Sequence, residues 1–248
     1  MPHSLLFFSV FAVAAILHGV TGIGFPILTT AALTLFLPLK AAIVISLFPT
    51  LVINGLSFLS GNRPMEVVKS NGALAASSIV GSLLGVQMLF WVNEGVLLLL
   101  LVAAVVLYVY ASLFGKLTHL VPSLPKTIGY GTVAGLIGGP TNAMSPVVMM
   151  YLLSTSEDKN TISQSANLCF LLGKLSQLVV LLSYGEAIFE PKLLTFTLAV
   201  TGLSVACLYG GFALRERISV VLFKRIIRVA LTLLAASLAA KALLRFLH

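Results

Sequence analysis

The sequence predicts an all-α polytopic membrane protein made of two inverted repeats, each with a broken re-entrant hairpin and three transmembrane helices. The prediction rests on an apolar composition, two glycine-rich breaks at matching places, and an uneven distribution of Lys and Arg. Of the 248 residues, 59% are hydrophobic and 9% are charged, whereas a soluble domain carries about 25% charged residues. The net charge of +8 does not indicate nucleic-acid binding here, because basic residues of a membrane protein first report its orientation.

The first apolar segment, 4–37, is interrupted by HGVTGIGFP at residues 18–26. As one helix its 34 residues would be roughly 51 Å long, whereas the hydrocarbon core of a bilayer is about 30 Å thick. The part after the break reaches only about 20 Å, too short to cross. We therefore expect two half-helices that fold back on each other, because a broken backbone inside a membrane must be buried in protein or line a cavity.

The remaining segments follow the same logic of apolar length. A second break, GLIGGPTNAMSP at 135–146, interrupts the first long segment of the second half. Two prolines in GKLTHLVPSLPK indicate a linker, so we expect a first repeat at 1–116, a linker at 117–126 and a second repeat at 127–248. The basic and apolar stretch RERISVVLFKRIIR, 215–228, suits an interfacial helix. The other predicted segments are 40–60, 71–92, 95–114, 127–153, 160–183, 192–214 and 226–247.

The two halves share a pattern of small residues. Gly19-x-x-Gly22 matches Gly135-x-x-Gly138 at an offset of 116 residues. The pattern Gly81-SLL-Gly85 resembles Gly202-x3-Ala206-x3-Gly210, and both predict close helix packing.

The basic residues distinguish two topologies. If all eight segments cross once, each face holds seven Lys and Arg, and no orientation is favoured. If both broken segments are re-entrant hairpins, ten lie on one face and four on the other, as the positive-inside rule requires. Each half then crosses three times, so the repeats are inverted and both termini lie outside the cytoplasm. Inverted repeats with broken helices are typical of secondary transporters, which bind their substrate near the midplane.

The breaks predict an anion site. A half-helix that begins inside the membrane presents unpaired N–H groups and a partial positive charge, which together attract anions. Pro26 suits the first turn of one half-helix, and Ser145 with Pro146 suits the N-cap and first position of the other. The predicted binding residues at the breaks are Thr21, Gly22, Gly24, Gly138, Gly139, Thr141, Asn142 and Ser145.

Lys174 is the second sign of an anion site. It lies ten residues from Tyr184, about 15 Å from the nearer end of its helix, too far for its side chain to reach the interface. Intramembrane charges usually serve function, and no membrane segment contains a carboxylate. Asn167 and Gln177 share its helix face, and we expect both to bind substrate with it. The alternative is a structural lysine capped by half-helix carbonyls. A comparable polar face is expected on the matching helix, at Ser46, Thr50, Asn54 and Ser57.

His18, beside the first break, is a possible proton carrier, because imidazole titrates near neutral pH. The alternative is a histidine that only bonds a neighbouring carbonyl.

The motifs GVTGIGFP, GLIGGPTNAMSP and NLCFLLGKLSQ resemble those of the TauE/SafE family of sulfite and organosulfur anion permeases. Ile23, Phe25, Thr141 and Asn142 stand where family members often carry a denser glycine run. The resemblance covers the whole chain and implies a multi-pass protein of the cell membrane. It also implies a small inorganic or organic sulfur-containing anion as substrate, often exported, with coupling to an ion gradient of protons or sodium.

Two other functions stay open, a passive anion channel and a membrane-embedded enzyme that acts on a lipid phosphate. The enzyme would need a buried acid–base or nucleophile set, which the membrane segments do not offer, so no enzymatic activity is expected. We expect no cofactor, no metal and no nucleic-acid partner, and membrane lipid as the surrounding partner.

Overall fold

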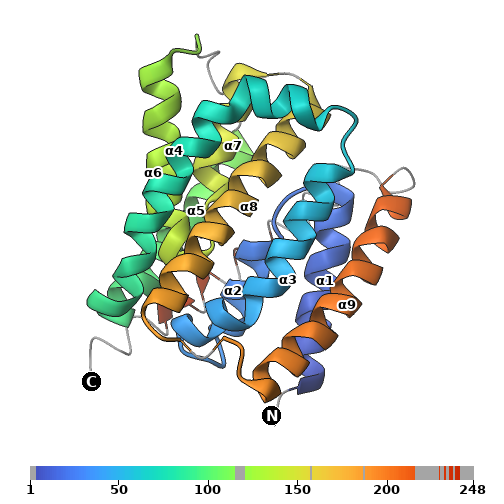
Figure 1. Cartoon of the computed structure of the whole chain (residues 1–248), viewed down its shortest axis with the longest axis vertical. Helices are drawn as coiled ribbons and strands as arrows, with labels where there is room; N and C mark the ends of the chain where they lie inside the picture. Colours follow the sequence, from blue (N-terminus) through green and yellow to red (C-terminus); the bar gives the residue numbers. More distant parts are fainter. Residues whose placement is uncertain are drawn as a thin grey trace.

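The computed structural model describes residues 4–114, 121–156, 158–186 and 188–215, and in the last segment residues 229, 232, 235, 236 and 238–240. Between residues 4 and 215 the described chain forms helices and no strand (Figure 1), as the sequence predicts. The helices are α1 (Ser4–Thr21), α2 (Phe25–Leu33), α3 (Leu39–Leu59), α4 (Pro64–Trp91), α5 (Glu94–Phe114), α6 (Leu124–Thr141), α7 (Ser145–Thr155), α8 (Lys159–Ser183) and α9 (Pro191–Leu214).

Most helix ends agree with the predicted segments, with two differences. Helix α4 begins at Pro64 rather than near residue 71, because a proline and an acidic residue, Glu66, in the first turn favour a helix start ahead of the apolar stretch. Helix α6 begins at Leu124, inside the predicted linker, also with a proline in its first turn. The predicted helix at 226–247 and the interfacial stretch at 215–228 lie outside the described residues, apart from the few named above.

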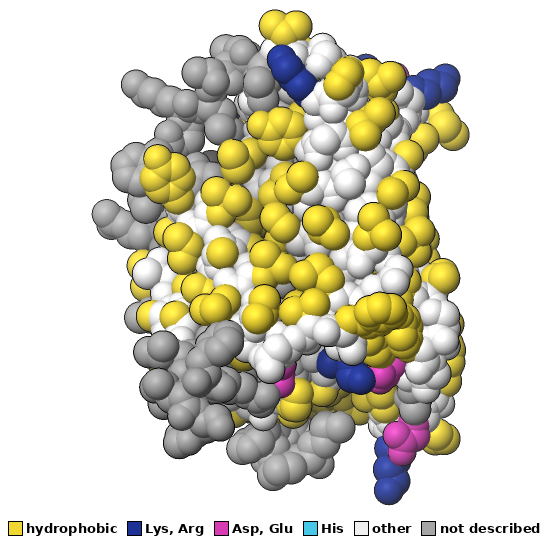
Figure 2. All heavy atoms as spheres, turned by 90° about the vertical axis from the view of Figure 1, so that its left-hand side faces the viewer, with side chains coloured by type: hydrophobic (Ala, Val, Ile, Leu, Met, Phe, Trp, Pro, Cys, Tyr) yellow, Lys and Arg dark blue, Asp and Glu magenta, His cyan; other side chains and the backbone are white. Residues whose placement is uncertain are grey.

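The helices form a molecule whose outer surface suits a bilayer. Within the described residues, five helices are long and apolar enough to cross a membrane, namely α1, α3, α4, α8 and α9. Hydrophobic side chains cover the middle of the face shown in Figure 2, and charged side chains gather above and below that band. The exposed apolar residues include Val80 and Leu84 on α4 and Val179 on α8. Such a surface would be unusual in a soluble protein and is what lipid requires.

Each broken segment folds into an antiparallel helical hairpin. In the first, the rings of Phe11 and Phe25 lie 5.9 Å apart and those of Phe7 and Phe36 lie 6.4 Å apart, so α2 runs back along α1 toward its start. In the second, the hydroxyls of Thr127 and Tyr151 are 2.6 Å apart, which brings α7 back along α6. Figure 1 shows both reversals.

The two hairpins start from opposite ends of the molecule. The Phe7–Phe36 contact puts the start of α3 beside the start of α1. Helix α4 therefore begins at the far end, and α6 begins there too, because α6 packs parallel to α4, from Gly131 against Leu74 to Gly139 against Val86. Figure 1 shows the starts of α1 and α6 at opposite ends.

Small residues allow α4 and α6 to touch along their backbones. A Cβ on Gly81 would lie 2.8 Å from the carbonyl carbon of Thr132. Gly85 faces Leu136 in the same way, and Gly139 faces the backbone of Gly85. The packing role predicted for Gly81 and Gly85 is confirmed.

The pattern predicted on α9 is wrong by one residue. A Cβ on Gly202 or Gly210 would have no heavy atom of the described chain within 4 Å, whereas a Cβ on Gly211 would lie 2.9 Å from the Cα of Gly19 on α1. The α9 face that meets α1 contains Leu208 and Gly211 because a spacing of three residues brings them to one side. The rings of Phe8 and Phe196, near the two helix starts, are 5.5 Å apart, so α1 and α9 run parallel.

Candidate anion-binding site

Helix α8 carries three of the seven polar side chains predicted to bind substrate, Asn167, Lys174 and Gln177. It begins after Asp158, whose carboxylate accepts hydrogen bonds from the backbone N–H groups of Asn160 and Thr161. The Thr161 hydroxyl and N–H hold the pKa of this exposed carboxyl below its usual value, because both bonds favour the charged form. The cap determines where α8 begins and so sets the depth of Lys174 along it.

Lys174 is buried, with 5% of its surface exposed. Its Nζ donates to Gln177 Oε1 at 2.6 Å and to Asn142 Oδ1. The ion pairs of the described chain are Lys40–Glu186 and Arg63–Glu66, and Lys174 forms none. An ammonium group has three N–H donors. Two of them bind the amide oxygens of Asn142 and Gln177, so one N–H donor remains.

Asn142 forms the second turn and joins the two halves of the chain. It caps α6 with φ 60°, a left-handed conformation that asparagine adopts more readily than most residues. Its Nδ2 donates to Thr30 Oγ1 at 2.7 Å and to Ser46 Oγ at 3.0 Å. These bonds orient its Oδ1 toward Lys174.

Gln177 closes the network. Its Nε2 donates to the Gly139 carbonyl at 2.7 Å and to Asn142 Oδ1 at 3.1 Å. The lysine is therefore held by neutral side-chain amides, and not by the backbone carbonyls of the structural alternative.

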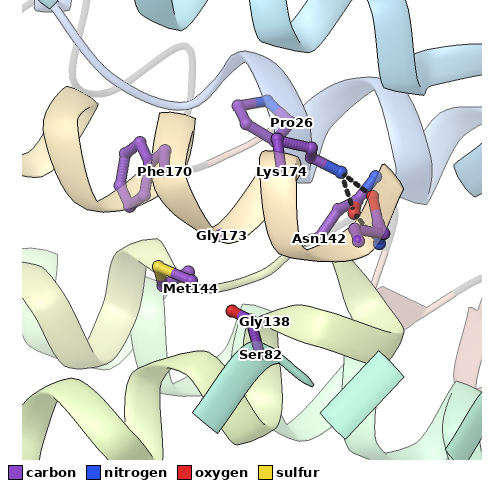
Figure 3. A pocket seen from close by; sticks show the side chains of 9 residues that line it. Pro26, Ser82, Gly138, Asn142, Met144, Phe170, Gly173 and Lys174 are labelled. Carbon is purple, nitrogen blue, oxygen red and sulfur yellow. Dashed lines mark hydrogen bonds between the residues drawn. The ribbon is translucent and has the colours of Figure 1, made fainter. Parts of the chain in front are cut away.

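A small cavity of about 20 Å³ adjoins this network (Figure 3), which is room for about one water molecule. Four of the predicted residues line it, namely Gly138, Asn142, Lys174 and Gln177. The sequence analysis did not predict the other lining residues, which are Pro26, Ser82, Met144, Phe170 and Gly173. The sequence predicts Pro26 only as a first-turn residue of its half-helix.

Ser82 and Met144 shape the far side of the cavity. The Ser82 Oγ is buried and has no hydrogen-bond partner in the described chain, and Figure 3 shows Ser82 and Met144 below Lys174, on the other side of the view. A Cβ on Gly173 would lie 2.6 Å from the terminal methyl of Met144 and 3.1 Å from Ser82 Oγ. Ser82 is one of several serines on the small-residue face of α4, so its position at the cavity has no signal of its own in the sequence.

The two predicted threonines stabilise the turns and do not line the cavity. Thr21 Oγ1 lies 2.8 Å from the Leu17 carbonyl and 2.7 Å from the Ile23 carbonyl. Thr141 Oγ1 donates to the Ile137 carbonyl at 2.6 Å and accepts from the Ala143 N–H at 3.2 Å. The two turns thus share one local design.

The first turn has its own set of contacts, away from the cavity. Gly22 and Gly24 have φ of 78° and 106°, which glycine adopts without steric cost. The Gly22 carbonyl accepts from Asn167 Nδ2 at 2.7 Å, and the Ser163 hydroxyl donates to the same carbonyl at 3.1 Å. Asn167 therefore joins α8 to the first hairpin.

His18 links this turn to α3. Its Nδ1 lies 3.3 Å from the Phe25 backbone nitrogen, which can only donate, and its Nε2 lies 3.0 Å from Ser57 Oγ. Nδ1 is then an acceptor, so the neutral ring carries its proton on Nε2 and donates it to Ser57.

The N-cap predicted at Ser145 is wrong. Helix α7 begins at Ser145, its N-cap is Met144, and no side chain bonds the first N–H groups. The left-handed Asn142 reverses the chain so tightly that the helix starts one residue earlier than the pattern predicts. Ser145 is buried but does not line the cavity.

A comparison with known protein families identifies the family of this chain. The profile of the family described as sulfite exporter TauE/SafE matches residues 6–238, nearly the whole chain. The chain belongs to this family. As a TauE/SafE protein it is a multi-pass membrane protein that serves anion transport, in a family of transporters and not of enzymes. No curated protein and no solved structure gave a significant match.

Proposed function

We propose that this TauE/SafE protein is a secondary transporter that exports sulfite, sulfonates or related sulfur-containing anions, bound at the midplane by Lys174 and the half-helix N-termini. One observation carries the proposal. The buried ammonium group of Lys174 adjoins a cavity, has no carboxylate partner in the described chain, and keeps one N–H donor that is not used by Asn142 or Gln177.

The energetics of a buried charge favour this reading. An isolated ammonium group in a low-dielectric interior is costly unless it is paired. The amide oxygens of Asn142 and Gln177 satisfy two of its donors but carry no net charge. An oxyanion in the cavity would satisfy the third donor and neutralise the ammonium group.

The start of α7 adds to the positive potential. Met144, its N-cap, lines the cavity, so the unpaired N–H groups of the first turn lie beside it. The partial charge of a helix N-terminus favours an anion there. Among the remaining predicted residues, Gly138 lets Met144 pack against the end of α6, where a Cβ would lie 2.6 Å from the Met144 Cβ. Thr21, Gly22 and Gly24 belong to the other hairpin, and Asn167 of α8 binds that hairpin at the Gly22 carbonyl.

The packing of the helices supports inverted repeats with boundaries near 1–116, 117–126 and 127–248. Helix α1 of the first half packs on α9 of the second, and α6 of the second packs on α4 of the first. Thr21 and Thr141 make equivalent bonds, and Pro26 and Pro146 have the same place in α2 and α7. Both pairs are 120 residues apart. In this proposal the hairpins are re-entrant and enter the membrane from opposite faces.

The cavity must enlarge to admit substrate. A sulfur oxyanion has several heavy atoms, and about 20 Å³ holds one water molecule. The unbranched side chain of Met144 is the wall most able to move, because methionine adopts many conformations at low cost. The cavity described here therefore corresponds to a closed form of the site.

The coupling ion is part of the proposal. If His18 carries a proton, the proton must enter at Nδ1, which requires the bond from the Phe25 N–H to break and the first turn to open. Sodium is the alternative and needs no such change.

Flux assays test the function. Purified protein in liposomes should move sulfite and sulfonates across the membrane and exchange labelled for unlabelled anion. A current whose reversal potential depends on the anion gradient alone would identify a channel instead. Release of phosphate from lipid, without anion flux, would identify a lipid-phosphate enzyme.

Cysteine labelling tests the topology. In a variant without Cys169 and Cys207, single cysteines near His3 and His248 should react with a membrane-impermeant reagent from outside the cell. The reason is the distribution of charge: Arg63, Lys69 and Lys126 lie near the starts of α4 and α6, at the opposite end of the molecule from Lys40 and Lys192 at the starts of α3 and α9 (Figure 1). Labelling of both ends from the cytoplasmic side only would contradict the topology.

Replacement of Ser82 tests the cavity. We expect Ser82→Ala to raise the KM for the anion about tenfold, because a hydrogen bond to a charged group contributes about 1.5 kcal/mol or more. The control is Ser78→Ala on the same helix, since the Ser78 hydroxyl already donates to the Ala75 carbonyl at 2.8 Å. Equal KM values for the two variants would show that Ser82 does not bind the anion.

A further inference from the structure

Four buried polar atoms that have no hydrogen-bond partner in the described chain lie on two neighbouring helices, and their residues do not line the cavity. They are Thr50 Oγ1 and both amide atoms of Asn54 on α3, and Asn167 Oδ1 on α8. All three residues are 0% exposed. Buried polar groups in folded proteins nearly always have a hydrogen-bond partner or ligand, so such a concentration indicates a ligand site. We refer to these three residues as the α3–α8 cluster.

The cluster lies between the Lys174 network and the first turn. Thr50 and Asn54 are one helical turn apart, on the face of α3 that also carries Ser46 and Ser57. Ser46 accepts from Asn142 of the Lys174 network, and Ser57 bonds His18 beside the first turn.

Helix α8 covers the same region. A Cβ on Gly55 would lie 3.9 Å from a methyl of Leu171, and Asn167 is one turn before Leu171. The Asn167 Nδ2 donates to the Gly22 and Ser163 carbonyls, whereas its Oδ1 has no hydrogen-bond partner among the described residues.

The chemistry of the cluster suits a cation. Its unpaired atoms include a hydroxyl oxygen and two amide oxygens, which are neutral, hard ligands. The C-terminal end of α1, which carries partial negative charge, ends at the same turn. Helix C-termini and unwound backbone carbonyls coordinate cations in other transporters with broken helices.

Charge balance supplies an independent argument. The buried cationic or ionisable basic side chains of the described chain are Lys174 and His18. The His18 ring is neutral when its two nitrogens make the bonds described above. Lys174 therefore offers one positive charge, whereas sulfite in its fully deprotonated form carries two negative charges. A monovalent cation in the cluster would complete the neutralisation.

We propose that the α3–α8 cluster binds an alkali-metal cation, Na⁺ or K⁺, together with a doubly charged anion at Lys174. The proposal rests on the proposed function for its role in transport, but the cation site itself is testable without transport. Cells keep K⁺ inside and Na⁺ outside, so co-transport with K⁺ favours export and co-transport with Na⁺ favours import.

Thermal unfolding of the purified protein tests cation binding. At constant ionic strength and chloride concentration, NaCl or KCl should raise the unfolding midpoint relative to choline chloride, because a ligand that binds the folded state stabilises it. Asn54→Leu and Thr50→Val should weaken the apparent cation affinity at least tenfold. Asn54→Asp, which keeps the oxygen ligands and adds a negative charge, should strengthen it.

Thr197→Val on α9 is the matched control, because this buried hydroxyl already donates to the Leu194 carbonyl at 3.0 Å. It should leave the cation-dependent shift unchanged. No shift with Na⁺ or K⁺, or an equal loss of the shift in Thr197→Val, would overturn the proposal. A third result would also overturn it: cluster variants that are still stabilised by the cation but are no longer stabilised by sulfite. That result would assign the cluster to the anion.

Flux assays separate this proposal from the function itself. Sulfite flux at alkaline pH should depend on Na⁺ or K⁺, whereas flux of the singly charged methanesulfonate should not. Equal cation dependence for both anions would contradict the charge balance. Cation-dependent stabilisation without flux of either anion would leave the cation site in place and refute the proposed function.

Discussion

Lys174→Met should abolish anion transport in liposomes while the protein still folds and inserts. The substitution removes the buried positive charge that we propose neutralises the substrate, and methionine fills a similar volume without a charge to bury. Asn142 and Gln177 keep their bonds to each other and, respectively, to Ser46 and the Gly139 carbonyl. Anion flux at saturating substrate is the measurement, with size-exclusion chromatography to verify folding.

Two further variants make this result specific. Lys174→Arg keeps the charge but presents a planar group in a cavity shaped for an ammonium group, so it should transport slowly and not at zero rate. Lys192→Met, at an exposed position at the start of α9, removes the same charge from the surface and should transport normally. Wild-type transport of sulfite by Lys174→Met would show that the lysine is structural and that the anion binds elsewhere.

Gly81→Val should prevent stable packing of α4 on α6. Even a Cβ would lie 2.8 Å from the Thr132 carbonyl carbon, so the two backbones must separate. Overpacking of this kind costs about 1–3 kcal/mol or more, and in a membrane the close approach of small residues is itself a main source of helix association. We expect low yield, aggregation in detergent and a lower unfolding midpoint.

The control is Gly72→Val on the same helix, where no heavy atom of the described chain lies within 4 Å of the Cβ position. It introduces the same β-branched residue into α4 and should cost only the change in helix propensity. If Gly81→Val unfolds at the same temperature as Gly72→Val, the α4–α6 contact is not tight in the membrane.

The candidate site was only partly predictable. Lys174 and Gln177 are near neighbours on one helix, and a charge at that depth is visible from the apolar length around it. Asn142 was also recognised, because it lies in a break where the chain must reverse. Ser82 was missed, because its role depends on contact with Gly173 and Met144, which belong to other helices. The packing face of α9 was misassigned by one residue, since a run of small residues allows more than one face.

The sequence by itself determined what depends on local composition and length. The all-helical class, the apolar segments and the two breaks follow from apolar runs near membrane thickness and from glycine and proline that interrupt them. Only the tertiary structure decided which residues meet. Asn142 binds Ser46, 96 residues earlier, and Asn167 binds Gly22, 145 residues earlier. Such pairs depend on the packing of α1 with α9 and of α4 with α6, which brings both turns against α3 and α8. The small residues of α4 marked its packing face, but no local pattern shows which helix packs there, because lipid-facing and buried helix faces are equally apolar in a membrane protein.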